Sequence, residues 1–369
     1  MEAEKIKAVG MISGGLDSTL AVKIMQDMGI EVIAVNISTQ FCSCSSIVFP
    51  QKVSRVKTVS NEFNVPLIIE KVGRDYVDMV KAPKYGYGKG LNPCQDCRIH
   101  MFRMGKAVME EHGAKFMFTG EVLGQRPMSQ QEHQLRRIEV DAGLEGLILR
   151  PLSAKHLPPT IPEKEGWVDR DKLLDISGRR RQPLTDLAAQ LNIADYPCAG
   201  GGCLLTEPGF SAKVQDAFVN NQDSDEQIRL LRFGRHFRLD PDSKLVLGKN
   251  EMENRLLKPY ANGKRLFFRP PPEMSGPDGL LDSRHETVPE ELIRASAGLL
   301  LRFSDAPRDE ETEILYGTSI ADLPGRVKVR PLTDEEIVKY RVPKKLKKVS
   351  GYAPAEAEAD DDSAEVDED

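Results

Sequence analysis

Six consecutive residues near the start of the chain, Ser13-Gly14-Gly15-Leu16-Asp17-Ser18, combine groups that bind a nucleotide phosphate. Two glycines let bare backbone N–H groups approach an anion, and the serine hydroxyls add donors at the expected start of a helix. A carboxylate beside a phosphate is repulsive unless a cation lies between them, so the predicted role of Asp17 is to hold Mg²⁺ on a pyrophosphate. The spacing is neither that of a Walker loop nor that of a dinucleotide turn. The predicted ATP-binding residues here are Ser13, Gly14, Gly15, Asp17 and Ser18.

The cysteines form a second group of residues that could take part in chemistry. Cys94 and Cys97 stand in Asn92-Pro93-Cys94-Gln95-Asp96-Cys97, and a glycine-rich run connects Cys198 with Cys203. Four thiols suit Zn²⁺, whereas three thiols suit an iron–sulfur cluster with one open iron, which serves an enzyme better. We expect Cys94, Cys97 and Cys203 to be catalytic and to hold a [4Fe-4S] cluster, with Cys198 as a further candidate ligand and Zn²⁺ as the alternative. The spacing of the other two cysteines, Cys42 and Cys44, is a weak signal, and we expect both to be unligated and without disulfides.

A third motif, Thr119-Gly120-Glu121-Val122-Leu123-Gly124-Gln125, directly follows an apolar run at 116–119. If that run is a strand of the same parallel sheet as residues 6–12, both motifs lie at one edge of the sheet. Gly120, Glu121 and Gln125 would then reach ATP or its Mg²⁺. Arg98 could neutralise phosphate charge.

These motifs need a sheet that brings strand ends together. Apolar runs predict strands at 6–12, 31–36, 66–70, 116–119 and 147–150, and amphipathic stretches predict helices at 16–28, 51–63, 96–112 and 184–192. This alternation predicts an α/β fold whose parallel sheet carries helices on both faces. Strand-like, arginine-rich segments at 228–239 and 265–268 and a helix near 289–301 predict a smaller α+β domain after it. The expected domains are residues 1–207 and 208–350, followed by a disordered acidic tail at 351–369.

The charge distribution separates these parts. The formal net charge of the chain is −6, but residues 353–369 carry nine carboxylates and no Lys or Arg. Residues 229–269 hold eleven Lys and Arg against four Asp and Glu, and residues 326–348 hold nine against three. Such basic strips are typical of a surface that binds a polyanion. The candidate RNA-binding residues are Arg232, Arg235, His236, Arg238 and Lys249, while Phe233 and Phe237 could either stack on bases or belong to the core.

The SGGLDS run resembles the signature of the PP-loop ATP pyrophosphatases, whose fold is similar to that of the adenine nucleotide alpha hydrolases. This family adenylates a substrate oxygen and releases pyrophosphate. With TGE-x-LGQ, the later Ser129-Gln130 and Arg150-Pro151-Leu152, residues 6–205 resemble the ThiI-type tRNA 4-thiouridine synthases. The family's THUMP region would precede the loop, where only a few residues stand, and its rhodanese cysteine would follow Cys203, where no cysteine occurs.

Residues 231–238 and 247–251 resemble the NFACT-R domain, which implies RNA binding in the second half. Together the resemblances imply ATP-dependent adenylation of a uridine carbonyl in tRNA, then sulfur insertion to give 4-thiouridine. The sulfur would come from sulfide at a cluster or from a persulfide or cysteine-desulfurase donor. Three alternatives stay open: a 2-thiouridylase of the related MnmA type, which also has an N-P-C-x-x-C run, a tRNA-binding adaptor without turnover, and adenylation of a small molecule.

The remaining expectations concern surroundings and partners. The charged N-terminus predicts no signal peptide, and no apolar run reaches the roughly 18 residues needed to span a membrane. We therefore expect a cytoplasmic protein with tRNA as its partner, no membrane partner and a homodimer as a further candidate assembly. We also expect the acidic tail to compete with RNA for the basic strips.

Overall fold

The computed structural model describes residues 5–42, 55–193 and 202–342, and these residues form two compact units. The first unit ends at Thr206 and the second begins at Glu207. Within the described ranges, no helix is long and apolar enough to cross a membrane. The expected acidic tail lies outside the described residues.

The first unit is built on a five-stranded parallel sheet with the order β3-β2-β1-β4-β5. Its strands are β1 (Lys7–Met11), β2 (Glu31–Ser38), β3 (Leu67–Lys71), β4 (Phe116–Thr119) and β5 (Ile148–Leu149). The chain leaves β1 toward β2 and β3, then returns to place β4 on the other side of β1. Such a reversal opens a crevice at the carboxyl ends of the two central strands, where ligands of α/β sheets bind.

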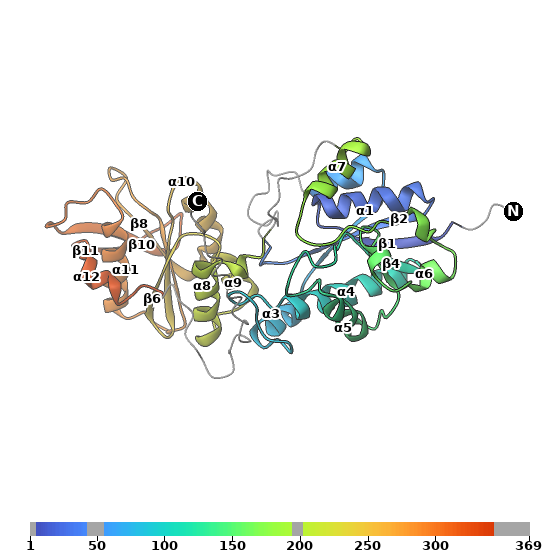
Figure 1. Cartoon of the computed structure of the whole chain (residues 1–369). Helices are drawn as coiled ribbons and strands as arrows, with labels where there is room; N and C mark the ends of the chain where they lie inside the picture. Colours follow the sequence, from blue (N-terminus) through green and yellow to red (C-terminus); the bar gives the residue numbers. More distant parts are fainter. Residues whose placement is uncertain (1–4, 43–54, 194–201, 343–369) are drawn as a thin grey trace, which may run out of the picture. The chain divides into compact units, whose positions relative to one another are not determined.

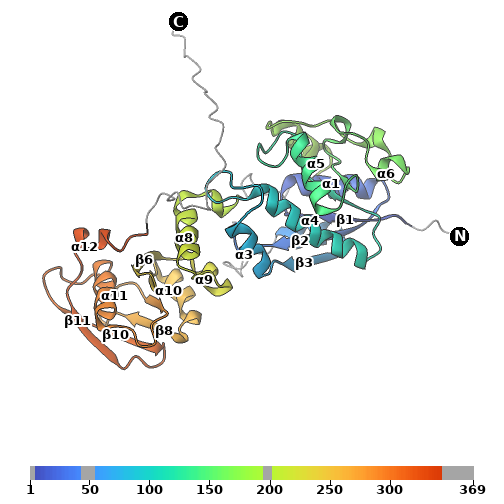
Figure 2. The same ribbon diagram turned by 90° about the horizontal axis from the view of Figure 1, so that it is seen from below.

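Helices cover both faces of this sheet. They are α1 (Leu16–Asp27), α2 (Arg55–Glu62), α3 (Arg74–Lys81), α4 (Cys94–Glu111), α5 (Glu132–Ala142), α6 (Ile161–Lys164) and α7 (Gln182–Gln190), with short 3₁₀ turns η1 (Ala154–His156), η2 (Arg170–Lys172) and η3 (Leu204–Thr206). Figure 1 shows α1 and α7 on one side of the sheet and α4 and α5 on the other, and Figure 2 looks from the α4 side.

Alternating strand residues feed two separate cores. On β1 and β4, Ala8, Phe116 and Phe118 pack with α1, α2 and α7. Val9 and Met117 point the other way and pack with α4 and α5. This period of two explains why the sheet is apolar on both faces, as a parallel sheet between helices requires.

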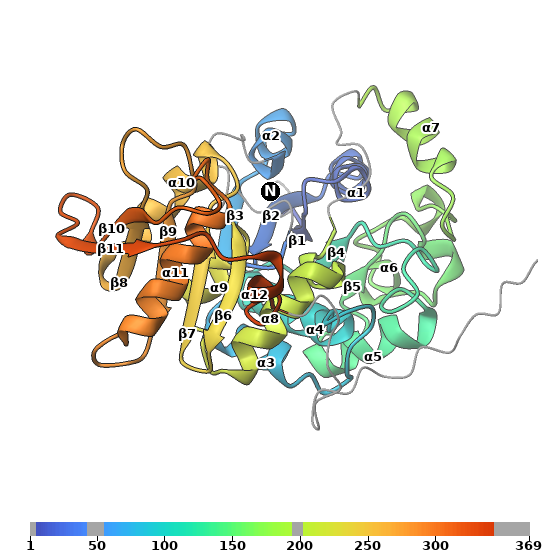
Figure 3. The same ribbon diagram turned by 90° about the vertical axis from the view of Figure 1, so that its left-hand side faces the viewer.

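The second unit contains a six-stranded antiparallel sheet with the order β11-β10-β8-β9-β7-β6. Its strands are β6 (Arg235–Asp240), β7 (Ser243–Leu247), β8 (Asn262–Arg269), β9 (Gly279–Ser283), β10 (Thr312–Ser319) and β11 (Gly325–Val329). Its helices are α8 (Pro208–Val219), α9 (Asp225–Leu230), α10 (Glu251–Leu257), α11 (Glu290–Arg302) and α12 (Asp334–Val338), with one 3₁₀ turn η4 (Lys258–Tyr260). In Figure 3, α11 lies across the sheet, and its buried face joins the main core of this unit.

The expected fold class is confirmed: an α/β unit with a parallel sheet precedes a smaller unit of mixed structure. The strand expected at 228–239 begins later than predicted, because residues 225–230 form α9 and β6 starts at Arg235. Ser224 caps this helix by accepting from the Gln227 amide, and Gly234 turns the chain with a φ of 68° before β6 begins. Local capping therefore overrides the apolar pattern that suggested a continuous strand from residue 228.

Candidate ATP and thiol site

The Ser13–Ser18 loop joins the carboxyl end of β1 to the start of α1. Gly14 has a φ of 75°, which favours glycine, and Gly15 is the N-cap residue of α1. The Ser18 hydroxyl donates to the Gly15 carbonyl at 2.9 Å, and the Thr19 hydroxyl donates to the same carbonyl at 3.0 Å. These bonds tie the loop to the helix, so its amides are held at the positive end of the helix dipole.

The Gly120 loop packs directly on this phosphate loop. A side chain at Gly120 would place its Cβ 2.4 Å from the backbone carbon and oxygen of Asp17. Only a residue without Cβ permits this approach, which brings the ends of β1 and β4 together. The two motifs thus meet at the crevice that the strand order creates.

Asp17 and Gln125 link the two loops through their side chains. The Gln125 Nε2 donates to Asp17 Oδ2 at 3.1 Å, whereas Asp17 Oδ1 is buried and has no hydrogen-bond partner among the described residues. A buried carboxylate oxygen without a donor is costly unless a cation or water binds it. Its surroundings fit a divalent cation held between Asp17 and a nucleotide phosphate.

Glu121 lies in an ion network that the sequence did not predict. It is 3% exposed, and its carboxylate pairs with Arg98 Nε at 3.2 Å and with Arg150 Nε at 3.2 Å. Arg150 also pairs with Glu139 of α5. Burial disfavours the charged form of Arg98, but Glu121 and the nearby thiols outweigh it and raise its pKa. Arg98, expected on a phosphate, here pairs with Glu121 and connects the ATP loops to the start of α4.

The cysteine-bearing segments are brought together by backbone bonds. Cys94 begins α4, and Cys97 follows one turn later. The segment around Cys203 bonds to the end of the segment after β2 and to the segment before α4. Leu204 N donates to the Phe41 carbonyl at 2.9 Å, and Leu91 N donates to the Leu205 carbonyl at 3.0 Å. Because of these two bonds, Cys203 lies near the start of α4, although the two segments are about a hundred residues apart in the sequence.

The three thiols share one electrostatic environment. Burial raises the pKa of Cys97 to about 11 and that of Cys203 to about 12, and the charge of Cys94 raises both further. The Tyr76 hydroxyl lies 3.1 Å from the Cys97 sulfur. Within 5–42, 55–193 and 202–342, no group of three His, Cys, Asp or Glu side chains is already arranged as a metal site. The donor chemistry, three clustered thiols next to a cation, still fits a thiolate-ligated cluster that displaces the thiol protons on binding.

The expectation for Cys42 is wrong. Cys42 is half-buried and disulfide-bonded, and its backbone pairs with that of Cys203. The number of cysteines in the chain predicted reduced thiols, but the count does not determine whether an individual cysteine is paired. Cys94, Cys97 and Cys203 are free thiols. Cys44 and Cys198 lie outside the described residues.

The candidate RNA-binding residues of the second unit divide into two kinds. Lys249 is exposed, and Arg235 is half-buried with its guanidinium over the Phe303 ring. His236 is 8% exposed and bonds the Phe233 carbonyl, and Arg238 pairs with Asp216 at 2.7 Å. These last two side chains are therefore engaged inside the unit and are left out of the interface proposed below.

Three further candidates have defined positions. Burial lowers the pKa of Arg232, which is half-buried. Phe233 and Phe237 are 5% and 3% exposed, so both are core residues of this unit. Stacking of these two phenylalanines on bases, one of the two alternatives from the sequence, does not fit this burial.

The edge strand β11 carries part of the second basic strip. Arg326, Lys328 and Arg330 are exposed, whereas Val327 and Val329 between them are buried. The alternation places Arg326 and Lys328 on the outer face of an edge strand, and Arg330 directly follows the strand. Arg326 faces Glu313 at 3.7 Å and Arg330 faces Glu336 at 3.6 Å, both at exposed positions where pairing is weak.

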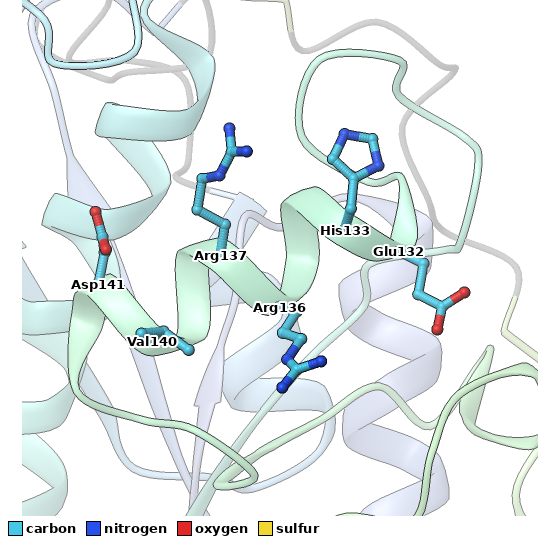
Figure 4. A pocket seen from close by; sticks show the side chains of 6 residues that line it. All are labelled: Glu132, His133, Arg136, Arg137, Val140 and Asp141. Atoms are coloured by element: carbon cyan, nitrogen blue, oxygen red, sulfur yellow. The ribbon is translucent and has the colours of Figure 1, made fainter.

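An open depression lies elsewhere, on α5 (Figure 4). It measures about 580 Å³ and is lined by Glu132, His133, Arg136, Arg137, Val140 and Asp141. Asp141 is held by the Lys84 ammonium and the Tyr85 hydroxyl, both at 2.7 Å, which lowers its pKa. All six lining residues come from one helix surface and none from the ATP loops, so this depression is not the candidate site.

Comparison with known families agrees with both halves of this description. Residues 4–156 match the family model of the thiamine biosynthesis protein ThiI, and residues 234–341 match that of the NFACT protein RNA binding domain. The chain thus joins a ThiI-like PP-loop region to an NFACT-type region, which confirms the resemblances found in the sequence.

Individual relatives resemble parts of the chain. The tRNA-specific 2-thiouridylase MnmA of Persephonella marina is 30% identical over 125 residues, which cover 31% of this chain and 35% of that protein. The chain therefore matches about a third of the length of this relative. A 4-thiouridine synthetase solved with RNA and ATP is 24% identical, with 51% of each chain covered and a TM-score of 0.32. The U34-tRNA thiolase NcsA of Methanococcus maripaludis, solved with its [4Fe-4S] cluster, is 13% identical over 61% of this chain and 69% of that one, with a TM-score of 0.29.

Proposed function

We propose that this chain, a ThiI-like PP-loop unit joined to an NFACT-type RNA-binding region, is an ATP-dependent tRNA sulfurtransferase. The observation that carries the proposal is the continuous contact from the phosphate loop to the thiols. Asp17 bonds Gln125, the Gly120 backbone packs on Asp17, and the adjacent Glu121 pairs with Arg98 at the start of α4. A nucleotide site and a thiol site that share one ion network suit a reaction in which ATP activates an atom that sulfur then replaces.

The chain's own residues bind and orient ATP. The amides of Gly14 and Gly15 and the hydroxyl of Ser13, which accepts from the Gly15 amide at 3.4 Å, lie at the start of α1 and would bind the phosphates. Asp17 would hold Mg²⁺, which neutralises charge on the departing pyrophosphate, and Gln125 fixes the carboxylate orientation. Gly120 and Glu121 close the nucleotide site from the β4 side, because Glu121 is locked by Arg98 and Arg150.

The proposed reaction has two displacements. The uridine carbonyl oxygen forms a bond to the α-phosphorus of ATP, and the bond to pyrophosphate breaks. The N3 proton of the uracil ring leaves in this step, as a double bond forms between N3 and the adenylated ring carbon. Hydrosulfide then forms a bond to that carbon, the bond from the carbon to the oxygen of AMP breaks, and the S–H proton replaces the one lost from N3 as the carbon–sulfur double bond forms. Fixed amide donors near the phosphates stabilise the charge that develops in the first displacement.

Cys94, Cys97 and Cys203 are the residues that would hold a [4Fe-4S] cluster. When bound, a cluster with three protein thiolates supplies an iron with an open position at which sulfide is held. The Tyr76 hydroxyl, 3.1 Å from the Cys97 sulfur, would donate to a Cys97 thiolate and orient this ligand. The expected result is that Cys97→Ser and Cys203→Ser lose iron and cluster absorbance after anaerobic reconstitution, while the buried core variant Met109→Leu on the same helix keeps both. Retention of the full iron content in either serine variant would contradict this ligand set.

The second unit would hold the RNA. We assign the contact to exposed cations, including Lys249, Arg326 and Lys328 of β11 and the following Arg330, with Arg232 and Arg235 at the margin. Such groups bind phosphates without reading sequence, so they position tRNA while the first unit selects the uridine.

The experiment that tests the function uses the full chain, reconstituted anaerobically with iron and sulfide. Unmodified tRNA, Mg-ATP and sulfide are added, and the digested RNA is examined for thionucleosides by mass spectrometry. We expect ATP-dependent 4-thiouridine. A 2-thiouridine product would instead support the second candidate, which the 30% identity to the Persephonella marina 2-thiouridylase favours. tRNA binding without any thionucleoside, in the presence of a cysteine desulfurase as well, would overturn the proposal in favour of an adaptor.

A further inference from the structure

Three consecutive arginines precede α7 and play no part in the site described above. Arg179, Arg180 and Arg181 are all exposed, and none of them has an ion-pair or side-chain hydrogen-bond partner among the described residues. The nearest carboxylate on α7, Asp186, is engaged by Gln182 Nε2 at 2.7 Å. Three adjacent exposed guanidinium groups concentrate positive charge at one place on the surface, which attracts an anion such as a phosphate.

The backbone ahead of these arginines is fastened to the nucleotide site. Gly178 N donates to the Leu123 carbonyl at 2.7 Å, and Ser177 pairs with Leu123 as a parallel bridge. A side chain at Gly124 would lie 3.6 Å from the Gly178 Cα. Residues 177 and 178 therefore pack against the same loop that supplies Glu121 and Gln125.

A fourth cation continues this positive surface on the other end of the loop. Arg126 directly follows Gln125, is exposed, and has no side-chain hydrogen bond or ion pair in the described part of the chain. Burial raises the pKa of the Cys203 thiol and the charge of Arg126 acts to lower it, so the guanidinium lies close enough to act on that thiol electrostatically. The loop 120–125 thus bonds to the residue that precedes Arg179–Arg181 and continues directly into Arg126.

We propose that Arg179–Arg181, together with Arg126, bind the phosphate backbone of the RNA substrate beside the nucleotide site and hold the target base against it. Arginine suits this task because its planar fork binds phosphate with two parallel hydrogen bonds and keeps its charge at any physiological pH. The anchored backbone at Gly178 fixes the distance between the bound phosphate and the ATP loop. The inference rests on the proposed function and adds to it a local RNA contact within the first unit.

The test measures tRNA affinity of the full chain against salt concentration. We expect the triple variant R179Q/R180Q/R181Q to reduce the steepness of log K against log salt by about 2 to 3, because each lost phosphate contact releases about 0.7 to 0.9 fewer counterions. The matched control, R136Q/K164Q/K172Q, removes three exposed charges elsewhere in the same unit and should leave the slope unchanged. Arg126→Gln should lower the slope by somewhat less than 1.

The affinity for ATP distinguishes the two ligands whose phosphates these arginines could bind, RNA and ATP. If the arginines bind RNA, the affinity for a non-hydrolysable ATP analogue without RNA stays within about twofold of the parent chain. A fall in nucleotide affinity with an unchanged RNA salt slope would overturn the proposal, since the arginines would then contact ATP. An unchanged slope in a triple variant of a chain that still binds tRNA and makes the thionucleoside would overturn this inference alone. A parent chain that binds no tRNA would overturn the proposed function and this inference together.

Discussion

The nucleotide site of the first unit and the basic sheet of the second unit use charged residues in different ways. In the first unit, Asp17, Glu121 and Arg150 converge in the interior and leave polar atoms buried without partners. In the second unit, the half-buried Asp216 and Arg238 and the buried Lys244 pair with one another, while Lys249, Arg326 and Lys328 are exposed. Buried side-chain atoms without a hydrogen bond also occur there, on Arg229, His236 and Arg265. The two regions therefore differ in the state of the central carboxylate: Asp17 keeps an oxygen without a donor at the end of β1, whereas Asp216 is paired with two cations.

The largest expected effect tests the nucleotide site of the first unit. Asp17→Asn removes the carboxylate charge beside the phosphate loop, so AMP formation should fall by about 100-fold or more, as loss of several kcal/mol of transition-state stabilisation implies. Asp27→Asn is the matched control, because Asp27 is exposed at the far end of α1 and its one ion pair within the described residues is with Lys23. AMP formation measured at saturating Mg-ATP distinguishes them. Equal rates for Asp17→Asn and the parent chain would remove Asp17 from the metal site.

The second half of the comparison is tested by breaking the interior charge cluster. Asp216→Asn leaves Arg238 and Lys244 buried without a carboxylate, so the second unit should lose about 3 to 5 kcal/mol in free energy of unfolding. The exposed pair between Glu251 and Arg255 offers the control, and Glu251→Gln should cost less than about 1 kcal/mol. Urea denaturation followed by circular dichroism measures both. Similar losses of unfolding free energy in Asp216→Asn and Glu251→Gln would show that the Asp216 cluster contributes no more stability than an exposed ion pair.

The same cluster predicts a pH dependence. Burial raises the pKa of Asp216, but Arg238 and Lys244 outweigh it, so its pKa in the folded chain lies below the ordinary value of 3.8. The stabilisation is therefore fully present above the unfolded pKa and is lost as the pH falls through the folded pKa. Unfolding of the parent chain should become easier in acid, and Asp216→Asn should weaken this dependence. A parallel pH profile in the two proteins would contradict the assignment.

A smaller effect tests the contact between the loops. Gly120→Ala introduces a Cβ 2.4 Å from the Asp17 backbone, so the first unit should lose about 1 to 3 kcal/mol and ATP affinity should fall. Gly209→Ala serves as control, because no atom lies within 4 Å of its Cβ position, and a stabilising change of up to about 1 kcal/mol is expected there. Thermal unfolding and nucleotide titration measure the two effects. Unchanged nucleotide affinity in Gly120→Ala would show that the contact between the two loops does not contribute to nucleotide binding.

The smallest effect sharpens the description of the second surface. Lys328→Gln removes one exposed cation from β11, so the salt slope of tRNA binding should fall by about 0.7 to 0.9. Arg294→Gln removes an exposed cation from α11 that pairs with Glu290, and it should leave the slope unchanged. Equal slopes for both variants would move the RNA contact away from β11.

Part of this comparison could be predicted from the sequence. Apolar runs located all five parallel strands, and motifs directly after β1 and β4 had to meet at one sheet edge. Partners distant in sequence could not be predicted. The pairs of Glu121 with Arg98 and Arg150 and the backbone bond from Leu91 to Leu205 depend on how helices and loops pack.

The second unit shows why basic motifs are harder to interpret. On β6, alternate side chains point to opposite faces, but the pattern from Arg235 to Asp240 carries charge on both faces. Only the packing of α8 against the strand decides that Arg238 meets Asp216 inside while Arg235 reaches the Phe303 ring. Charge in a strand therefore identifies a basic segment without identifying its exposed face.

The central claim is that the nucleotide loops and the thiols act as one site, and its most direct test counts two products of a single turnover. Excess reconstituted full chain is mixed anaerobically with limiting tRNA, Mg-ATP and sulfide, and AMP and thionucleoside are quantified in the same samples. One AMP per thionucleoside, with both products absent in Asp17→Asn, is the predicted result. Thionucleoside formed without AMP, or AMP formed at an unchanged rate without RNA, would contradict the claim.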